Sequence, residues 1–347
     1  MSLRRAVVIS LITKYSTTLM GLASMMLIAR LLTPSQIGTF AIGSAIILSL
    51  TEFRVLGASQ YLIRLEYVEK NDVRSALGLT ILVSWGIGVI VLAASVPFAD
   101  YYGIPDLAPI FWILSVGFLF GPYLGINTAL LTRRMDFDSV FRIRFYSTLG
   151  SIALTLILVF QGYGYFSLAW GQAALSLIAL VLNVFLCAPE MIWLPSFKKM
   201  KPIASFGIYN STANLLRKSV VTVPDLVIGK MGTTTQVGVF SRGLGFIEFM
   251  SQNVLMGIQP VILPYFSNIK NQNGDSSQAY TQSSVLLGGF LWPVLAVASV
   301  VSLPAIRLFF GDQWDEAAPY ASVLALWAML RTVHWFASDY LIAHGEE

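Results

Sequence analysis

Charged residues are scarce in this sequence. Only 12% of its 347 residues are Asp, Glu, Lys or Arg, whereas 56% are hydrophobic, and the mean hydropathy is +0.72. A soluble domain of this composition would lack the polar residues that cover a water-exposed surface. The composition therefore excludes an ordinary soluble globular protein. It predicts an all-α polytopic membrane protein.

Cysteine and catalytic motifs are also nearly absent. The single cysteine, Cys187, excludes an intrachain disulfide and argues against a metal cluster. We find no P-loop, no zinc-binding spacing, no nucleophile elbow and no cleavable signal peptide. The longest polar connections, 188–202 and 267–278, are too short to fold a catalytic module. We therefore expect no enzyme activity, no catalytic residues, no metal and no cofactor, while coupling to a proton or sodium gradient stays open.

Apolar runs recur along the whole chain, each near the ~20 residues that a helix needs to cross a bilayer. They predict about ten transmembrane helices. The expected spans are 7–31, 38–63, 75–98, 107–131, 145–162, 165–187, 203–228, 235–266, 281–306 and 317–343.

The connections between these spans alternate in charge. One set holds Arg4, Arg5, Arg64, Lys70, Arg74, Arg133, Arg134, Arg142, Arg144, Lys198, Lys199, Lys201 and Lys270, and the opposite set holds Arg30, Lys230 and Arg307. Because cationic loops stay on the cytoplasmic side of a membrane, this bias predicts a cytoplasmic N-terminus. The net charge is +4, and the cations lie mainly at the ends of the predicted helices, so the charge does not indicate nucleic-acid binding.

The sequence contains an internal repeat. Residues 36–40 (QIGTF) recur at 236–240 (QVGVF), and 101–103 (YYG) recur as 309–311 (FFG). Six predicted spans separate the copies, so both copies enter the membrane in the same direction, as parallel repeats related by an axis along the membrane normal do.

The repeat predicts two pseudo-symmetric helical lobes. Residues 1–200 would form an N-terminal lobe of six helices, and residues 201–347 a C-terminal lobe of four. The second lobe would need two more helices to match the first. We therefore expect a truncated C-terminal lobe.

A polar stripe runs along the predicted helix 203–228. At about 100° per residue its members fall within roughly a 100° arc. They are Asn210, Asn214, Arg217, Lys218 and Asp225. A cation at mid-membrane depth costs about 2.5–3.5 kcal/mol on insertion scales, so such side chains usually face a wet cavity or a partner.

The stripe predicts a substrate cavity. Lys14 corresponds to Asn214 in the repeat, which places polar side chains on matching helices. The predicted substrate-binding residues are Lys14, Asn214, Arg217, Lys218, Asp225 and Arg242, and the candidate ion-coupling residues are Glu52 and Glu248. The predicted spans hold six cations at membrane depth, including Arg54 and Arg331, and four anions, including Asp339. This surplus of two positive charges favours an anionic cargo.

Several residues carry the resemblance to a known family. They are Ala29-Arg30-Leu31-Leu32 with Pro34 and Gly38, Gly57 with Tyr61-Leu62-Ile63, Asn214, Arg217 and Asp225 before Ile228-Gly229, and Gly238 and Phe240 with Ser241-Arg242. With these residues the chain resembles the Wzx-type polysaccharide exporters, the flippases of lipid-linked oligosaccharides in the multidrug/oligosaccharidyl-lipid/polysaccharide superfamily.

The resemblance implies two six-helix lobes around a partly cationic cavity in the bacterial inner membrane. It also implies transport of an undecaprenyl-diphosphate-linked oligosaccharide or polysaccharide unit across the bilayer by alternating access. A polysaccharide polymerase and chain-length machinery are the protein partners that such a function implies.

Plainer interpretations stay open. Arg217 and Lys218 could pair with Asp225, although seven or eight residues exceed the usual one-turn spacing. Lys14 could pair with Glu52, and each carboxylate could neutralise a nearby cation. Structural roles are the plainer interpretation of Arg54 and Arg242, and also of Arg331, His334 and Asp339, which could otherwise form a proton relay. The alternative functions are a multidrug cation antiporter of the same fold and a membrane-embedded polysaccharide-assembly enzyme or partner.

Overall fold

The computed structural model describes residues 3–54, 56–65, 67–187, 194–198, 200–272 and 274–344. These residues form helices joined by short connections, and the described part contains no strand. The chain divides into two compact units, Met1–Gly238 and Val239–Glu347. The predictions that rest on Lys199, on the side chains of Arg4, Arg5 and Asn210, or on the end of the chain at 345–347 lie outside the described residues.

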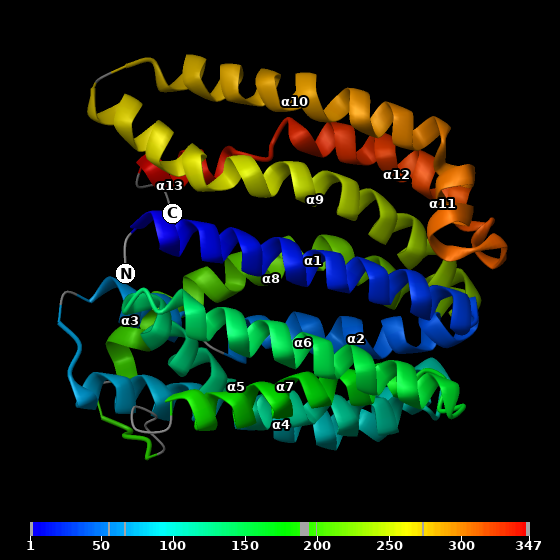
Figure 1. The fold of residues 1–347 in the computed structure, drawn as a ribbon, viewed down its shortest axis with the longest axis horizontal. Helices are drawn as coiled ribbons and strands as arrows, with labels where there is room; N and C mark the ends of the chain where they lie inside the picture. Colours follow the sequence, from blue (N-terminus) through cyan, green and yellow to red (C-terminus); the bar gives the residue numbers. More distant parts are fainter. Residues whose placement is uncertain are drawn as a thin grey trace. The chain divides into compact units, whose positions relative to one another are not determined.

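In the described part of the first unit there are eight helices and the start of a ninth. Their bounds are α1 Leu3–Leu31, α2 Pro34–Arg54, α3 Ala58–Arg64, α4 Lys70–Tyr102, α5 Leu107–Arg133, α6 Phe137–Phe160, α7 Phe166–Cys187 and α8 Met200–Met231, followed by the first turn of α9 Thr234–Asn271. Long helices pack side by side, with α4 against α5, α6 against α7 and α2 against α8 (Figure 1).

The second unit contains the rest of α9 and the helices that follow. These are α10 Ser276–Val300, α11 Ser302–Phe310, the 3-10 turn η2 Asp312–Trp314, α12 Ala317–Thr332 and α13 Ala337–His344. Within this unit α10 lies beside α12 (Figure 1). The units divide the chain at a different residue from the predicted lobes, so the lobe boundary at residue 200 stays a prediction.

The helical membrane architecture is confirmed, but the number of ten spans is not. Among the described residues, seven helices are long and apolar enough to cross a membrane: Val8–Leu31, Pro34–Arg64, Lys70–Tyr102, Leu107–Arg133, Phe137–Phe160, Phe166–Leu186 and Ser276–Val300. The other predicted spans fall on α8 and α9 and on the short helices α12 and α13. Three predicted spans are interrupted, at Leu56 and Gly57, at Val301, and between Thr332 and Ala337.

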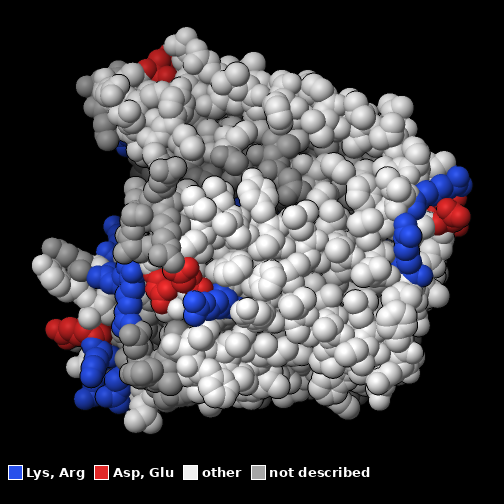
Figure 2. Space-filling view, in the orientation of Figure 1, with Lys and Arg blue, Asp and Glu red and all other residues white. Residues whose placement is uncertain are grey.

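Cationic side chains gather at one end of the first unit. On the face shown in Figure 2, Lys and Arg cluster near α3, and a broad, mostly uncharged region extends from there. Arg133 donates to the carbonyl oxygens of Leu62 and Ile63, and Arg74 donates to that of Leu194. Within the first unit, the connections that hold Arg64, Arg74, Arg133 and Lys198 therefore meet at one end. The cytoplasmic location of that end stays a prediction.

The repeat is visible in the way that α2 and α9 begin. Thr33 and Gln36 exchange backbone and side-chain hydrogen bonds at 3.0 and 3.3 Å, and Thr233 and Gln236 exchange the same two bonds at 2.9 and 3.2 Å. This reciprocal pattern is a capping box, which satisfies amide groups that a helix start leaves unpaired. The repeated sequence thus folds into the same local structure twice.

The two helix starts cross at a pair of glycines. A Cβ on Gly38 would lie 1.7 Å from the carbonyl oxygen of Thr234, and a Cβ on Gly238 would lie 2.0 Å from that of Pro34. Residues 34 and 38 correspond to 234 and 238 in the repeat, so the contact is symmetric. Only glycine allows backbones to approach this closely.

The repeat extends to the helix pairs α4–α5 and α10–α12. In the first unit Trp85 donates its indole N–H to the carbonyl of Leu119 at 3.2 Å, and in the second Trp292 donates to that of Met329 at 3.1 Å. In both units the chain then passes a glycine with positive φ, Gly103 or Gly311, before the second helix of the pair. The internal repeat predicted from short motifs is therefore present in the packing of each unit.

Candidate functional site

The site begins with the long antiparallel contact between α2 and α8 in the first unit. Near one end of this contact, a Cβ on Gly207 would lie 1.7 Å from the carbonyl oxygen of Leu56. In the middle, the hydroxyl oxygens of Ser49 and Thr222 lie 3.0 Å apart. Farther along, Gly229 packs against the side chain of Ile42. Small residues on α8 thus bring its polar stripe against α2.

An ion pair between α2 and α8 lies within this contact. The ammonium nitrogen of Lys218 is 2.5 Å from a carboxylate oxygen of Glu52, and the two side chains are 42% and 21% exposed. The pair is therefore partly accessible, and it lies on the polar stripe of α8. Lys218 and Glu52 were predicted separately, as a substrate contact and an ion-coupling residue, and the structure brings them together.

The other predicted residues of the stripe lie on the same helix at different depths. Arg217 is exposed, and Asn214 and Asp225 are half-buried. Lys14 is exposed on α1, which packs against α6. The part of the chain that the structure describes contains no ion pair between Lys14 and Glu52. The partner of Glu52 is Lys218 instead.

A second cation lies close to this pair. Arg54, at the end of α2, donates from Nη1 to the carbonyl oxygen of Gly117 at 3.1 Å. A Cβ on Gly121 would lie 2.4 Å from Cδ of Arg54, so the two glycines of α5 form a slot for the arginine side chain. The Arg54 guanidinium also interacts electrostatically with Glu52.

Glu248, the other candidate ion-coupling residue, lies in the second unit and is also paired. One carboxylate oxygen is 2.6 Å from Nη2 of Arg331, and the other accepts a hydrogen bond from Gln252 at 3.1 Å. The Arg331 guanidinium lies over the rings of Trp327 and Trp335, at 4.5 and 4.8 Å from their centroids. This arrangement supports the plainer interpretation, in which the carboxylate neutralises a neighbouring cation.

The two units hold a guanidinium at corresponding helix positions. Pro109 near the start of α5 matches Pro319 near the start of α12, an offset of 210 residues, and the same offset aligns Gly121 of α5 with Arg331 of α12. In the first unit Gly121 packs against Arg54, which comes from α2. In the second unit the residue at the matching position is itself an arginine, Arg331, and it pairs with Glu248 on α9. The arginine at this position therefore comes from a different helix of the repeat in each unit.

Arg242, a predicted substrate contact, is buried in the second unit with 8% of its surface exposed. Its guanidinium carbon lies 5.3 Å from the ring centroid of Phe310 and 5.1 Å from that of Trp314. Stacking of this kind stabilises a guanidinium against aromatic faces. The geometry favours the structural role that was the plainer interpretation of this residue.

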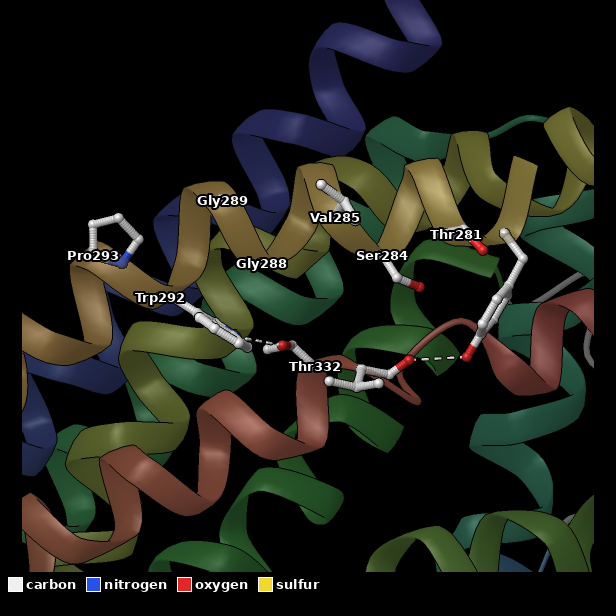
Figure 3. A pocket seen from close by; sticks show the side chains of 10 residues that line it. Thr281, Ser284, Val285, Gly288, Gly289, Trp292, Pro293 and Thr332 are labelled. Carbon is white, nitrogen blue, oxygen red and sulfur yellow. Dashed lines mark hydrogen bonds between the residues drawn. The ribbon is translucent and has the colours of Figure 1, made fainter. Parts of the chain in front are cut away.

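An apolar groove of about 640 Å³ lies between α10 and the end of α12 (Figure 3). Along it Trp292 donates to the hydroxyl of Thr332 at 2.9 Å, and the Tyr280 hydroxyl donates to the carbonyl of Val333 at 2.9 Å. That carbonyl belongs to the interruption after α12. The described residues that line the groove include no charged side chain, so the groove does not resemble an anion site.

A model of the family described as "Polysaccharide biosynthesis protein" matches residues 27–319, which include both copies of the capping box and the α2–α8 ion pair. This chain belongs to that family. The membership agrees with the sequence resemblance to polysaccharide exporters.

Three relatives carry names from polysaccharide assembly. The chain is 25% identical to the succinoglycan biosynthesis transport protein ExoT of Rhizobium meliloti, over 91% of this chain and 64% of the relative. It is 21% identical to the teichuronic acid biosynthesis protein TuaB of Bacillus subtilis, over 84% and 60%. It is 20% identical to the lipopolysaccharide biosynthesis protein WzxC of Escherichia coli, over 90% and 64%. The chain thus spans 60% to 64% of the length of these relatives.

Two solved structures of MATE share the fold. One is a point mutant, with a TM-score of 0.53 and 16% identity over 98% of this chain and 80% of that chain. The other is the straight conformation, with a TM-score of 0.54 and 14% identity over 99% and 82%. At this identity the likeness establishes the fold alone.

The α2–α8 contact presents a partly exposed cation, Lys218, beside the carboxylate of Glu52. In the described residues no three His, Cys, Asp or Glu side chains gather closely enough to hold a metal ion. The helical spacing of the sequence was enough to indicate the polar stripe. It gave no signal for the glycine slot of Arg54, because that slot depends on which face of α5 meets α2.

Proposed function

We propose that this protein translocates an oligosaccharide or polysaccharide unit linked to undecaprenyl diphosphate across the bacterial inner membrane. The family and the names of its relatives support a role in polysaccharide export. The observation that carries the proposal is the pair of adjacent cations on the polar stripe of α8, exposed Arg217 and partly exposed Lys218.

Two adjacent cations of different shape are well suited to bind a diphosphate. A guanidinium offers several N–H donors in a plane, and an ammonium offers a compact charge, so together they can bind both phosphates of a diphosphate. The apolar surroundings strengthen these charge-assisted hydrogen bonds relative to water. The lipid tail would stay among the acyl chains of the bilayer while the sugar passes through the protein.

We infer that translocation proceeds by alternating access and is driven by a proton or sodium gradient. Parallel repeats that place binding groups near mid-membrane are typical of transporters that move in this way. No catalytic step is required of the protein itself, since the lipid-linked substrate is moved and not changed. A polymerase and chain-length proteins would then act on the exported unit.

A multidrug cation antiporter is the second candidate, because the solved neighbours are MATE structures. A cation antiporter needs carboxylates that are available to a cationic substrate. Glu52 and Glu248 are instead both held by basic side chains. The ion pairs therefore favour an anionic substrate over a cationic drug.

Complementation tests the proposed function. The gene would be expressed in a bacterial strain that lacks its own lipid-linked oligosaccharide exporter, and surface polysaccharide would be measured. We expect restored polysaccharide from the wild-type protein and a loss with Arg217→Ala or Lys218→Ala at equal membrane abundance. Leu216→Ala, an exposed neighbour on α8, serves as the matched control. Normal polysaccharide from both cation variants would refute the site.

A further inference from the structure

The ammonium group of Lys218, which is proposed to bind phosphate, is in contact with the carboxylate of Glu52. We propose that Glu52 is a built-in competitor for Lys218, which a diphosphate must displace and which thereby selects against weaker anions. This inference rests on the proposed function, because it takes Lys218 as an anion ligand.

The geometry of the pair fits an exchangeable contact. The nitrogen–oxygen distance of 2.5 Å is that of a formed ion pair, yet the Lys218 side chain is 42% exposed. An anion can therefore reach Lys218 without prior rearrangement of the helices. By contrast, the Glu248–Arg331 pair of the second unit is only 16% and 21% exposed and lies beside two tryptophans, as a fixed structural pair would.

The pair is not needed to hold α2 against α8. The same contact contains the hydroxyl pair Ser49–Thr222 at 3.0 Å and the close backbone approach of Gly207 to Leu56. Loss of the Lys218–Glu52 contact would leave both of these in place. A purely structural role for Glu52 is therefore redundant with its neighbours.

Arg54 lowers the cost of releasing Glu52. A carboxylate left alone in an apolar region is strongly disfavoured. Glu52, however, interacts electrostatically with Arg54, whose guanidinium is fixed by the carbonyl of Gly117. When an anion binds Lys218 in place of Glu52, the Glu52 carboxylate still interacts with Arg54. The site can thus exist in two charge arrangements, one with the internal carboxylate on Lys218 and one with the ligand there.

This competition favours ligands of high charge. A singly charged anion gains little by replacing a carboxylate that is already in contact with the lysine. A diphosphate brings a larger charge and more acceptor oxygens, and it can contact neighbouring Arg217 as well. Displacing Glu52 costs every anion the same free energy, so only a ligand whose own contacts exceed that cost binds well, and a diphosphate has the most contacts to offer.

The test is anion binding to the purified full chain in detergent, with inorganic pyrophosphate and inorganic phosphate as probes in titration calorimetry. We expect Glu52→Gln to bind pyrophosphate about 1.5- to 5-fold more tightly than the wild type, the range that the loss of one partly exposed ion-pair competitor gives. Binding of inorganic phosphate should strengthen by a similar factor. Lys218→Gln should bind pyrophosphate more weakly than the wild type.

Asp315→Asn is the matched control, because it removes the carboxylate of another exposed ion pair, Arg307–Asp315, which does not belong to the site. It should leave both affinities unchanged. If Glu52→Gln does not fold, Glu52→Asp keeps the charge and shortens the side chain by one methylene. That variant should give a smaller gain in pyrophosphate affinity.

The outcomes separate the inference from the proposed function. Unchanged or weaker binding by Glu52→Gln, together with weaker binding by Lys218→Gln, would overturn the competitor role and leave the anion site intact. Wild-type binding by Lys218→Gln, or no binding of pyrophosphate to any variant, would overturn both.

Discussion

The glycine crossing at the starts of α2 and α9 makes a quantitative prediction. Replacing Gly38 with alanine places a Cβ 1.7 Å from the carbonyl oxygen of Thr234, whereas ordinary van der Waals contact begins near 3.4 Å. The obstructing atom belongs to the backbone, so it cannot rotate away. Overpacking of this kind costs about 1–3 kcal/mol, and the gain of up to about 1 kcal/mol from alanine in a helix offsets only part of it. The difference is a net destabilisation of about 0–2 kcal/mol, and we expect a value near the upper end because the obstructing atom is backbone.

Gly21→Ala is the matched control for this prediction. Gly21 lies within α1, and a Cβ there would meet no atom within 4 Å. Its replacement should be neutral or stabilise by up to about 1 kcal/mol, the helix-propensity gain alone. The two substitutions are chemically identical, so their opposite signs isolate the contact.

The assay is thermal unfolding of the purified protein in detergent. Gly38→Ala and Gly238→Ala should each lower the Tm, and the double variant should lower it by less than the sum, because one substitution already separates the helices. Equal Tm values for Gly38→Ala and Gly21→Ala would refute the close crossing.

Three further predictions concern single contacts. Glu248→Gln leaves Arg331 without its carboxylate and should destabilise the protein by about 3 kcal/mol in chemical unfolding; wild-type stability would contradict a fixed pair. Thr233→Ala removes one capping hydrogen bond from α9 and should cost about 1 kcal/mol, whereas Thr233→Ser should retain most of it; equal unfolding midpoints for the two variants would count against the cap. The Arg307 guanidinium donates hydrogen bonds to Asp315 and holds the pKa of that carboxyl below its usual range. The ion pair therefore stabilises the folded protein at a pH above the unfolded-state pKa of Asp315. This stabilisation is lost as the pH falls through the folded-state pKa. Asp315→Asn should therefore make the Tm less sensitive to acid, and an unchanged acid profile would contradict this assignment.

Periodic and repeated patterns in the sequence predicted most of the fold. Hydrophobic runs predicted seven helices that the structure contains as membrane-length helices. The pairs QIGTF and QVGVF predicted the equivalence of α2 and α9, which the capping boxes confirm. Both patterns are local, so the sequence carries them without knowledge of the tertiary contacts.

The interruptions of the predicted spans were not foreseen. Residues 333–336 contain neither glycine nor proline, yet α12 ends at Thr332 and α13 begins at Ala337. The carbonyl of Val333 is held by the Tyr280 hydroxyl from α10. Such a break is stabilised by tertiary contacts, for which a single sequence gives no local signal.

Pairing of charges was also beyond the sequence. Helical spacing placed Lys218 on the polar stripe of α8, and composition marked Glu52 as a membrane-depth carboxylate. Their contact depends on the register of α2 against α8, which is set by small residues such as Gly207 and Gly229. A one-turn shift would pair Glu52 differently.

Translocation in proteoliposomes tests the central assignment most directly. Vesicles containing the purified chain would receive an undecaprenyl-diphosphate-linked sugar in one leaflet, and its appearance in the other leaflet would be followed by enzymatic labelling of the exposed sugar. We expect transfer well above that in protein-free vesicles, and transfer near the protein-free level for Lys218→Ala and Arg217→Ala. Transfer by both variants at the wild-type rate would contradict the role of these two cations.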